Sequence, residues 1–138
     1  MAISSGVCTS YKAECMQGIH SSTDAYKLAL YTSSAAIGPD TTAYTAAGEA
    51  SGLGYVAGGT TMSGFLATRS GNTATLDFAN TTWPTITTIA RGALIYNSSK
   101  GNRAVAVLDF GQDVGASNGP LTVVNPVTGA TTSLVRWA

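Results

Sequence analysis

The chain has 138 residues and a formal net charge of zero, and 10% of its residues are charged, against about 25% in typical soluble domains. This length suits one domain. Its seven basic residues cannot supply the concentrated basic surface that binding to phosphate backbones requires, so nucleic acid is not an expected partner.

The low charge also bears on association. A free monomer with so few charges, and no excess of either sign, is poorly protected against sticking to other molecules. We therefore expect a protein that packs against copies of itself or against a larger assembly, although an ordinary Ser/Thr-rich β domain explains the composition almost as well. No apolar run is long enough to span a membrane, and the opening MAISSGVCTS lacks the features of a signal peptide.

Residues 9–20 are the one good helix candidate. Their apolar side chains recur at helical spacing, with Thr9 or Ser10 available as N-cap and Gly18 weakening the last turn. The apolar stripe consists of Tyr11, Cys15, Met16 and Ile19. Such a helix more often closes one end of a β core than docks on a neighbouring subunit, and both interpretations remain open.

The two cysteines, Cys8 and Cys15, are seven residues apart. On one helix they would lie roughly 10 Å from each other, which is too far for a disulfide. We expect free thiols and assembly in a reducing cytoplasm.

Residues 24–32 alternate in polarity as a strand does. Residues 33–54 are rich in Ser, Thr, Ala and Gly, and they predict a long loop with a helical turn near 41–47. Connections of this length inside a compact domain often contact something, so this segment, including Tyr44, could be an arm laid over a partner.

Residues 54–61 and 62–69 predict weaker strands interrupted by glycines, followed by a turn at 70–72 and a strand at 73–79. The densest apolar runs come next, at 93–96 and 104–108, and the polar loop between them predicts a hairpin. The second run is apolar on both alternating faces, which indicates a central strand.

Further along the chain, Pro84 suggests a strand start or an edge, and Gly92 a bend between two strands. Residues 112–120 predict a polar loop, 121–124 a short strand, 127–131 a turn, and 132–137 a last strand tied into the sheet by Trp137. The profile is mainly β. It predicts an antiparallel β-sandwich or jelly roll of about eight strands with one short N-terminal helix, forming a single domain over residues 1–138.

Catalytic and metal-binding patterns are weak. His20 could form a triad with Asp24 or Asp40, but no GxSxG motif supports it. Oxygen ligands at Asp109, Asp113 and Asn118 lack the spacing of a calcium loop. We expect no enzyme activity, no metal and no cofactor.

Two segments carry a resemblance. One joins YKAE and MQGIH, in residues 11–20, to YKLALYT at 26–32, and the other joins ARGALIYN at 90–97 to AVAVLDFG at 104–111. This order resembles small structural proteins of tailed bacteriophages that are encoded among the head and tail genes. The resemblance spans most of the chain and contains no catalytic motif, so it assigns no functional residue.

The resemblance implies a virion component, with a capsid cement or decoration protein as the first candidate. Such a protein would be assembled in the host cytoplasm, sit on the capsid surface as a trimer and brace the shell of major capsid protein. The candidate contacts with a subunit or the capsid are Tyr11, Cys15, Met16, Ile19 and Tyr44. The alternatives are a tail, neck or fibre-associated subunit and a carbohydrate-binding β-sandwich that uses exposed tyrosines.

Overall fold

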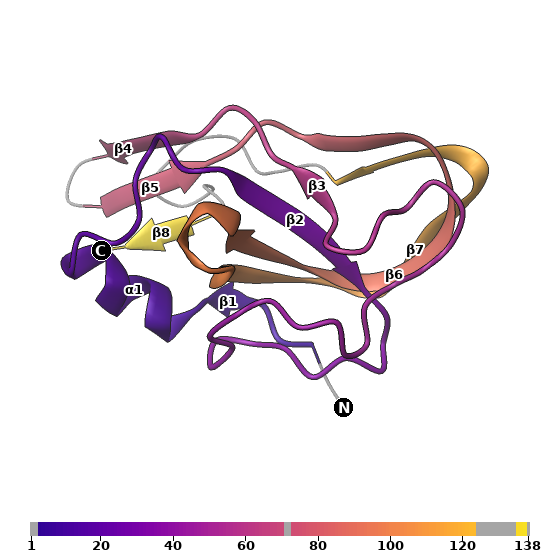
Figure 1. The fold of residues 1–138 in the computed structure, drawn as a ribbon, viewed down its shortest axis with the longest axis horizontal. Helices are drawn as coiled ribbons and strands as arrows, with labels where there is room; N and C mark the ends of the chain where they lie inside the picture. Colours follow the sequence, from indigo (N-terminus) through magenta and orange to yellow (C-terminus); the bar gives the residue numbers. More distant parts are fainter. Residues whose placement is uncertain (1–2, 71–72, 124–134, 138) are drawn as a thin grey trace.

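A computed structural model describes residues 3–70, 73–123 and 135–137, and it is mainly β with antiparallel sheets (Figure 1). One sheet has five strands in the order β1-β7-β6-β2-β3, and the other has three in the order β4-β5-β8. The elements are β1 (Gly6–Val7), α1 (Thr9–Met16), β2 (Tyr26–Tyr31), β3 (Thr60–Thr61), β4 (Leu66–Ser70), β5 (Thr73–Asp77), β6 (Thr81–Asn97), the 3-10 turn η1 (Ser98–Lys100), β7 (Arg103–Val123) and β8 (Val135–Trp137).

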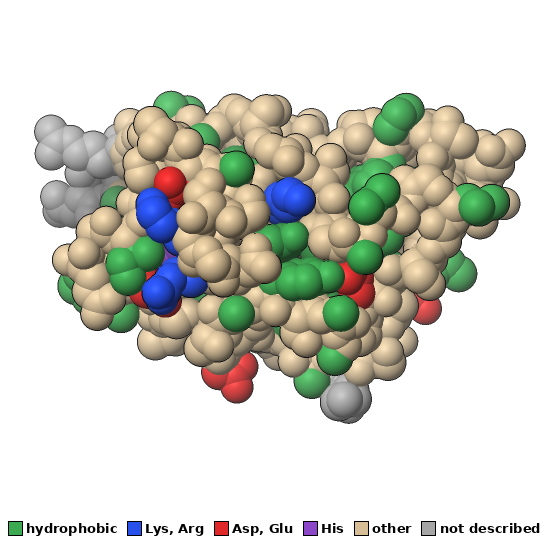
Figure 2. All heavy atoms as spheres, viewed as in Figure 1, with side chains coloured by type: hydrophobic (Ala, Val, Ile, Leu, Met, Phe, Trp, Pro, Cys, Tyr) green, Lys and Arg blue, Asp and Glu red, His purple; other side chains and the backbone are tan. Residues whose placement is uncertain are grey.

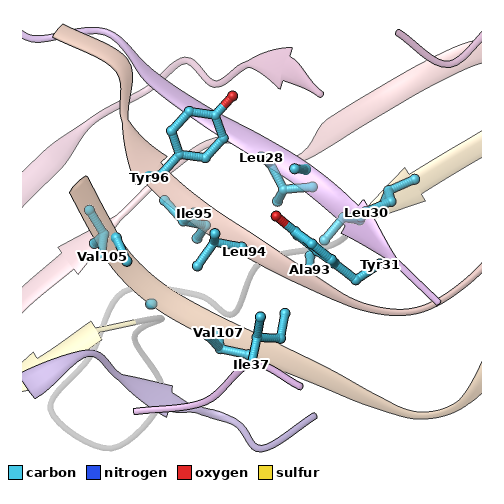
Figure 3. Close-up of a cluster of buried hydrophobic side chains, with 14 of the residues drawn as sticks. Leu28, Leu30, Tyr31, Ile37, Ala93, Leu94, Ile95, Tyr96, Val105 and Val107 are labelled. Carbon is cyan, nitrogen blue, oxygen red and sulfur yellow. The ribbon is translucent and has the colours of Figure 1, made fainter. Parts of the chain in front are cut away.

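The core lies where β2 and β7 flank the second half of β6. Leu28 of β2 faces Ile95 of β6, which faces Ala106 of β7, and these side chains are buried. Figure 3 shows the apolar side chains of these strands gathered together, with Ile37 of the following loop beside Val107. The predicted hairpin and its two-sided apolar strand are therefore confirmed, because both faces of the sheet are covered here.

The hairpin loop begins at Asn97, whose side chain accepts a hydrogen bond from the Ser99 N–H at 3.0 Å. Gly101 and Asn102 then adopt left-handed conformations, with φ values of 70° and 61°. Glycine and asparagine tolerate this region of backbone space better than other residues. The turn chemistry in the sequence therefore predicts the loop correctly.

The helix is shorter than predicted. It spans Thr9–Met16, and Gly18 follows with a φ of 75°, which ends a helix by turning the chain into the left-handed region. The predicted N-cap at Thr9 or Ser10 is wrong, because Cys8 holds this position without a side-chain cap.

The predicted loop at 112–120 is also wrong, since these residues continue β7 opposite the first half of β6. Gly92 does not separate two strands but lies inside β6. The turn-forming residues are instead accommodated in irregularities of the ladder. Ala90 pairs with Val114 and Gly92 with Asp109. One residue of β6, Arg91, therefore lies opposite the four residues 110–113 of β7.

Pro84 lies inside β6 as well, next to a smaller register shift between Trp83 and Ile86. Irregularities of this kind bend a strand pair and increase its twist. The β6–β7 ribbon accordingly curves round one end of the molecule in Figure 1.

The long loop after β2 has no helical turn at 41–47, contrary to the prediction, but it is otherwise irregular as expected. It packs on the chain's own sheet, with Ala35, Ile37 and Ala50 buried. Gly59 ends this stretch with a φ of 82°, and a Cβ there would lie 1.9 Å from the Leu28 carbonyl oxygen. Only glycine fits so close to β2.

The remaining strand predictions hold in part. β3 and β4 are shorter than the stretches 54–61 and 62–69, while β5 matches 73–79 closely. β8 pairs with β5, so the C-terminal strand is tied into a sheet as expected. Residues 71 and 72 of the predicted turn, residues 132–134 and the predicted turn at 127–131 lie outside the described residues.

Candidate functional site

A shallow groove of about 800 Å³ lies at the bend of the β6–β7 ribbon, beyond the end of β2. It forms where β6 runs past the end of β2 and keeps β7 as its paired strand. The lining residues come from the loop after β2 and from the ribbon, and they are Thr32, Ser51, Thr87, Thr88, Ile89, Asp113, Val114, Gly115, Ala116 and Ser117.

Ile89 is the most prominent apolar side chain of the groove, with 63% of its surface exposed. It faces Gly115 across the ladder, so no side chain on β7 covers it directly. Gly115 is tightly placed, because a Cβ there would lie 2.2 Å from the Thr88 carbonyl oxygen. The close contact of the two strands therefore keeps Ile89 accessible.

The loop beside β6 adds two further exposed apolar side chains, Leu53 at 81% and Val56 at 73%. Its position is fixed by a hydrogen bond from the Thr87 N–H to the Leu53 carbonyl at 2.8 Å and by one from the Thr88 hydroxyl to the Ser51 carbonyl at 2.7 Å. Figure 2 shows Lys and Arg side chains towards the middle and the opposite side of this view, while the ribbon end is mostly apolar and uncharged polar surface with some acidic atoms. The ribbon end is therefore a low-charge surface.

The predicted contact residues do not form one patch. Tyr11 is 6% exposed and lies under the molecule's surface, while Met16, on the same helix, is 76% exposed. Cys15 and Ile19 are half-buried. Tyr44 lies in the long loop, and its hydroxyl donates to Glu49.

Ile89, Leu53 and Val56 were missed by the sequence reasoning. A signal for Ile89 exists in the strand periodicity. Ile86 and Ile89 are three residues apart, so in a strand they point to opposite faces and one of them leaves the core. Ile86 is buried and Ile89 is the exposed member.

A polar cluster joins the helix to the central hairpin. His20 Nε2 lies 2.9 Å from Glu14 Oε1, and Arg103 Nη1 donates to the other oxygen of Glu14 at 2.8 Å. The imidazole is almost fully buried and packs on the Tyr11 ring at a centroid distance of 4.6 Å. Asn97 Nδ2 approaches His20 Nδ1 at 2.9 Å, so both ring nitrogens have partners.

The tautomer of His20 follows from the orientation of Asn97. The side-chain oxygen of Asn97 accepts a hydrogen bond from the Ser99 N–H, and the side-chain NH2 group donates to Asp24 Oδ2 at 2.8 Å. The same amide must therefore donate to His20 Nδ1, which places the imidazole proton on Nε2, where it is donated to Glu14.

The Asp24 carboxylate contacts Asn97 and Lys100 rather than the imidazole of His20. The hydrogen bond from Asn97, with those from Lys100 and Ser21, lowers the pKa of Asp24. The triad considered for His20 and Asp24 is therefore not formed, and the groups instead tie the helix to the hairpin.

A second polar centre holds the long loop. The Glu49 carboxylate accepts hydrogen bonds from the hydroxyl groups of Tyr44 and Tyr55 and, at 2.7 Å, from the Gly58 N–H. Burial away from water, and to a smaller extent the hydrogen bond to Glu49, raises the pKa of Tyr44 to about 12. The hydroxyl groups of these tyrosines are thus used inside the fold.

Metal and thiol chemistry find little support among the described residues. No group of three or more His, Cys, Asp or Glu side chains there could hold a metal ion. Asp109 pairs with Arg91 at 3.3 Å and lies in a strand rather than in a loop. Both cysteines are free, and burial raises the pKa of Cys8 to about 12, which disfavours its reactive thiolate.

Within the described part of the chain, no helix has the length and apolar character needed to cross a membrane. No protein-family model matches the sequence, and neither a curated protein nor a solved structure is significantly similar to it.

Proposed function

We propose that the protein is a non-enzymatic structural component of a tailed-bacteriophage virion, acting as a cement or decoration protein on the capsid surface. The observation that carries this proposal is the low-charge surface at the end of the β6–β7 ribbon, with Ile89, Leu53 and Val56 exposed. Large apolar side chains that share one end of a protein with few charges favour a surface that is covered in an assembly.

In this proposal the two antiparallel sheets form a β-sandwich, and the subunits assemble as trimers that brace the major capsid protein. Multivalent attachment then gains affinity from many copies, each of which contributes a modest contact. The polar clusters at His20 and Glu49 support the same role, because they stiffen the subunit rather than present groups to a substrate.

The test is light scattering after size exclusion of the purified protein, alone and mixed with expanded empty capsids of the same phage. Co-elution with the shells and a higher shell melting temperature are the expected results. A protein that leaves the shells unchanged would contradict the capsid assignment. Binding to tail or neck complexes instead would support the alternative of a tail, neck or fibre-associated subunit.

The carbohydrate-binding alternative has weaker support. Sugar sites commonly stack the ligand on exposed aromatic rings, and the groove lining contains no aromatic side chain. Tyr44 and Tyr55 donate to Glu49, and Tyr31 and Tyr96 donate to backbone carbonyls. Glycan-array binding that disappears in Tyr44→Ala would reverse this preference.

A further inference from the structure

The strand edges that no described strand pairs with include those of β7 and β4. The outer edge of β7 is covered along its first part, where Tyr44 donates to the Asn102 carbonyl and β1 pairs with Ala106 and Val107. The cover ends at Asp109, whose N–H donates to the Ser5 hydroxyl at 2.7 Å. From residue 110 to 123, no described strand pairs with this edge.

The second of these edges belongs to β4. This strand pairs with β5 on one side and is the outer strand of the three-stranded sheet. Residues 66–68 are all exposed, and Leu66 has 47% of its surface accessible. A short strand with an open edge and both faces exposed has little of its own chain to pack against.

Open edges present backbone N–H and C=O groups in a row, and the chemistry that satisfies them is another extended strand. Natural edges are usually protected by lysines or other charges. Residues 110–123 contain no Lys or Arg and one carboxylate, Asp113. The uncovered part of β7 is therefore poorly protected against strand addition.

We propose that the occupant is a second copy of this chain, whose β4 adds to the free edge of β7 beside the groove. Two complementary features favour this pairing. Leu66 on β4 and Ile89 beside β7 are both exposed apolar side chains that such a contact would cover. The charges of the two edges are also opposite in sign. The sequence of β4, LATRS, contains one basic residue and no acidic one, and residues 110–123 contain one acidic residue and no basic one.

Pairing β4 of one copy with β7 of the next is a head-to-tail contact, because two different surfaces meet. Such contacts generate closed rings when the rotation between copies closes, whereas an edge that pairs with itself generates a two-fold dimer. The inference rests on the proposed assembly of copies in the virion and names the contact through which a trimer would form. The zero net charge leaves no long-range repulsion between copies.

The test measures the mass of the full chain by size exclusion with light scattering for the wild type, Leu66→Asp and Ile89→Asp. Each substitution places a carboxylate at one side of the contact. Gln17→Asp is the matched control, because Gln17 is also exposed but lies at the end of the helix and is not a candidate contact. Circular dichroism confirms that each variant is folded.

The wild type and Gln17→Asp should form closed oligomers, and each of the two edge variants should elute at the chain mass of 14.0 kDa. An equimolar mixture of Leu66→Asp and Ile89→Asp retains one intact contact, formed by β4 of the Ile89→Asp chain and β7 of the Leu66→Asp chain. The mixture should therefore yield a heterodimer of twice that mass, which no self-pairing edge would produce.

A monomeric wild type, edge variants that keep the wild-type mass, or a control that dissociates like them would each overturn the inference. So would folded edge variants whose mixture stays monomeric. The proposed function is judged separately by shell binding. Shell binding by a monomer refutes the edge contact alone, while a ring that ignores shells, tails and necks refutes the virion assignment alone.

Discussion

The two halves of the β6–β7 ribbon are built from the same two strands, yet they differ in how they are covered. In the half that contains residues 92–97 and 103–108, nearly every residue of both faces is buried. In the other half, residues 81–90 alternate between buried and exposed positions, and most residues from 109 to 122 are exposed or half-buried. The first half is stabilised by its own chain, whereas the second half offers surface to other molecules.

The boundary coincides with the three extra residues of β7 opposite Arg91 and with the Arg91–Asp109 ion pair. β1 and β2 both end at this boundary, so the ribbon continues without neighbours on part of its length. Within one strand pair, this boundary therefore separates a half that its own chain buries from a half that is largely exposed.

The largest expected effect separates the two halves by a matched pair of substitutions. Leu94→Ala removes a fully buried side chain and should lower the free energy of unfolding by about 2–5 kcal/mol. Ile89→Ala, in the exposed half, should change it by about 0.5 kcal/mol or less when both substitutions are made in the Leu66→Asp chain, which the edge inference expects to be monomeric. Urea unfolding of both variants measures the contrast, and equal losses would show that the two halves are equally covered in solution.

A second pair examines how closely the ribbon strands approach. Gly115→Ala places a Cβ against the Thr88 carbonyl and should cost about 1–3 kcal/mol through displacement of β7. Gly119→Ala meets no atom closer than 3.9 Å and should be nearly neutral. Thermal unfolding distinguishes the two variants, and a neutral Gly115→Ala would mean that the ribbon is looser than described.

The covered half should also show an acid dependence through Asp24. Hydrogen bonds to Asn97 and Lys100 lower the pKa of this carboxyl below its ordinary value of 3.8. Its stabilisation is therefore complete above about pH 4 and is lost as the pH falls through the lowered pKa. Asp24→Asn should cost about 1–3 kcal/mol at pH 7, because donors that faced a carboxylate then face an amide.

Urea unfolding of the wild type and Asp24→Asn between pH 2 and 7 measures this difference. The two curves should converge at the acid end. A constant gap across the whole range would indicate that Asp24 acts by packing rather than by charge.

The smallest effect is expected at the boundary itself. Arg91 and Asp109 are both partly exposed, and such pairs contribute little to stability. Arg91→Gln should therefore unfold like the wild type. In an NMR titration of this variant the pKa of Asp109 should stay below its usual range, because the hydrogen bond from the Gly111 N–H is the main cause of the lowering. A return of this pKa to its ordinary value would give Arg91 the larger role.

Much of the covered half could be predicted from the sequence, because its signals are local. The alternation around Leu28 and the two apolar runs on either side of Asn97 specify the strands and their hairpin. The helix was found for the same reason. Its end was placed too late, since the left-handed turn at Gly18 outweighed the apolar residue Ile19 beyond it.

The second half of the ribbon was mispredicted because its order depends on partners distant in sequence. Gly111, Asp113 and Asn118 have turn chemistry, yet β6 pairs with the residues around them and places the irregularities in the ladder. The candidate surface was missed with it. The spacing of Ile86 and Ile89 indicates only that one of the two leaves the core. The partner that leaves Ile89 accessible is Gly115, 26 positions later in the chain, which no local pattern reveals.

Asn118 and Gly119 form an Asn-Gly pair in the uncovered part of β7, and this pair makes the strand prone to slow deamidation. An asparagine followed by glycine deamidates readily, since the next backbone nitrogen can attack the side-chain amide with little steric hindrance. Asn118 is exposed, and its φ of 53° is already unusual for a strand. Asn97, by contrast, is fully buried and its amide is held by His20 and Asp24. Storage should therefore add a negative charge at residue 118 first, so that old preparations become more acidic along this one strand while the hairpin loop remains intact.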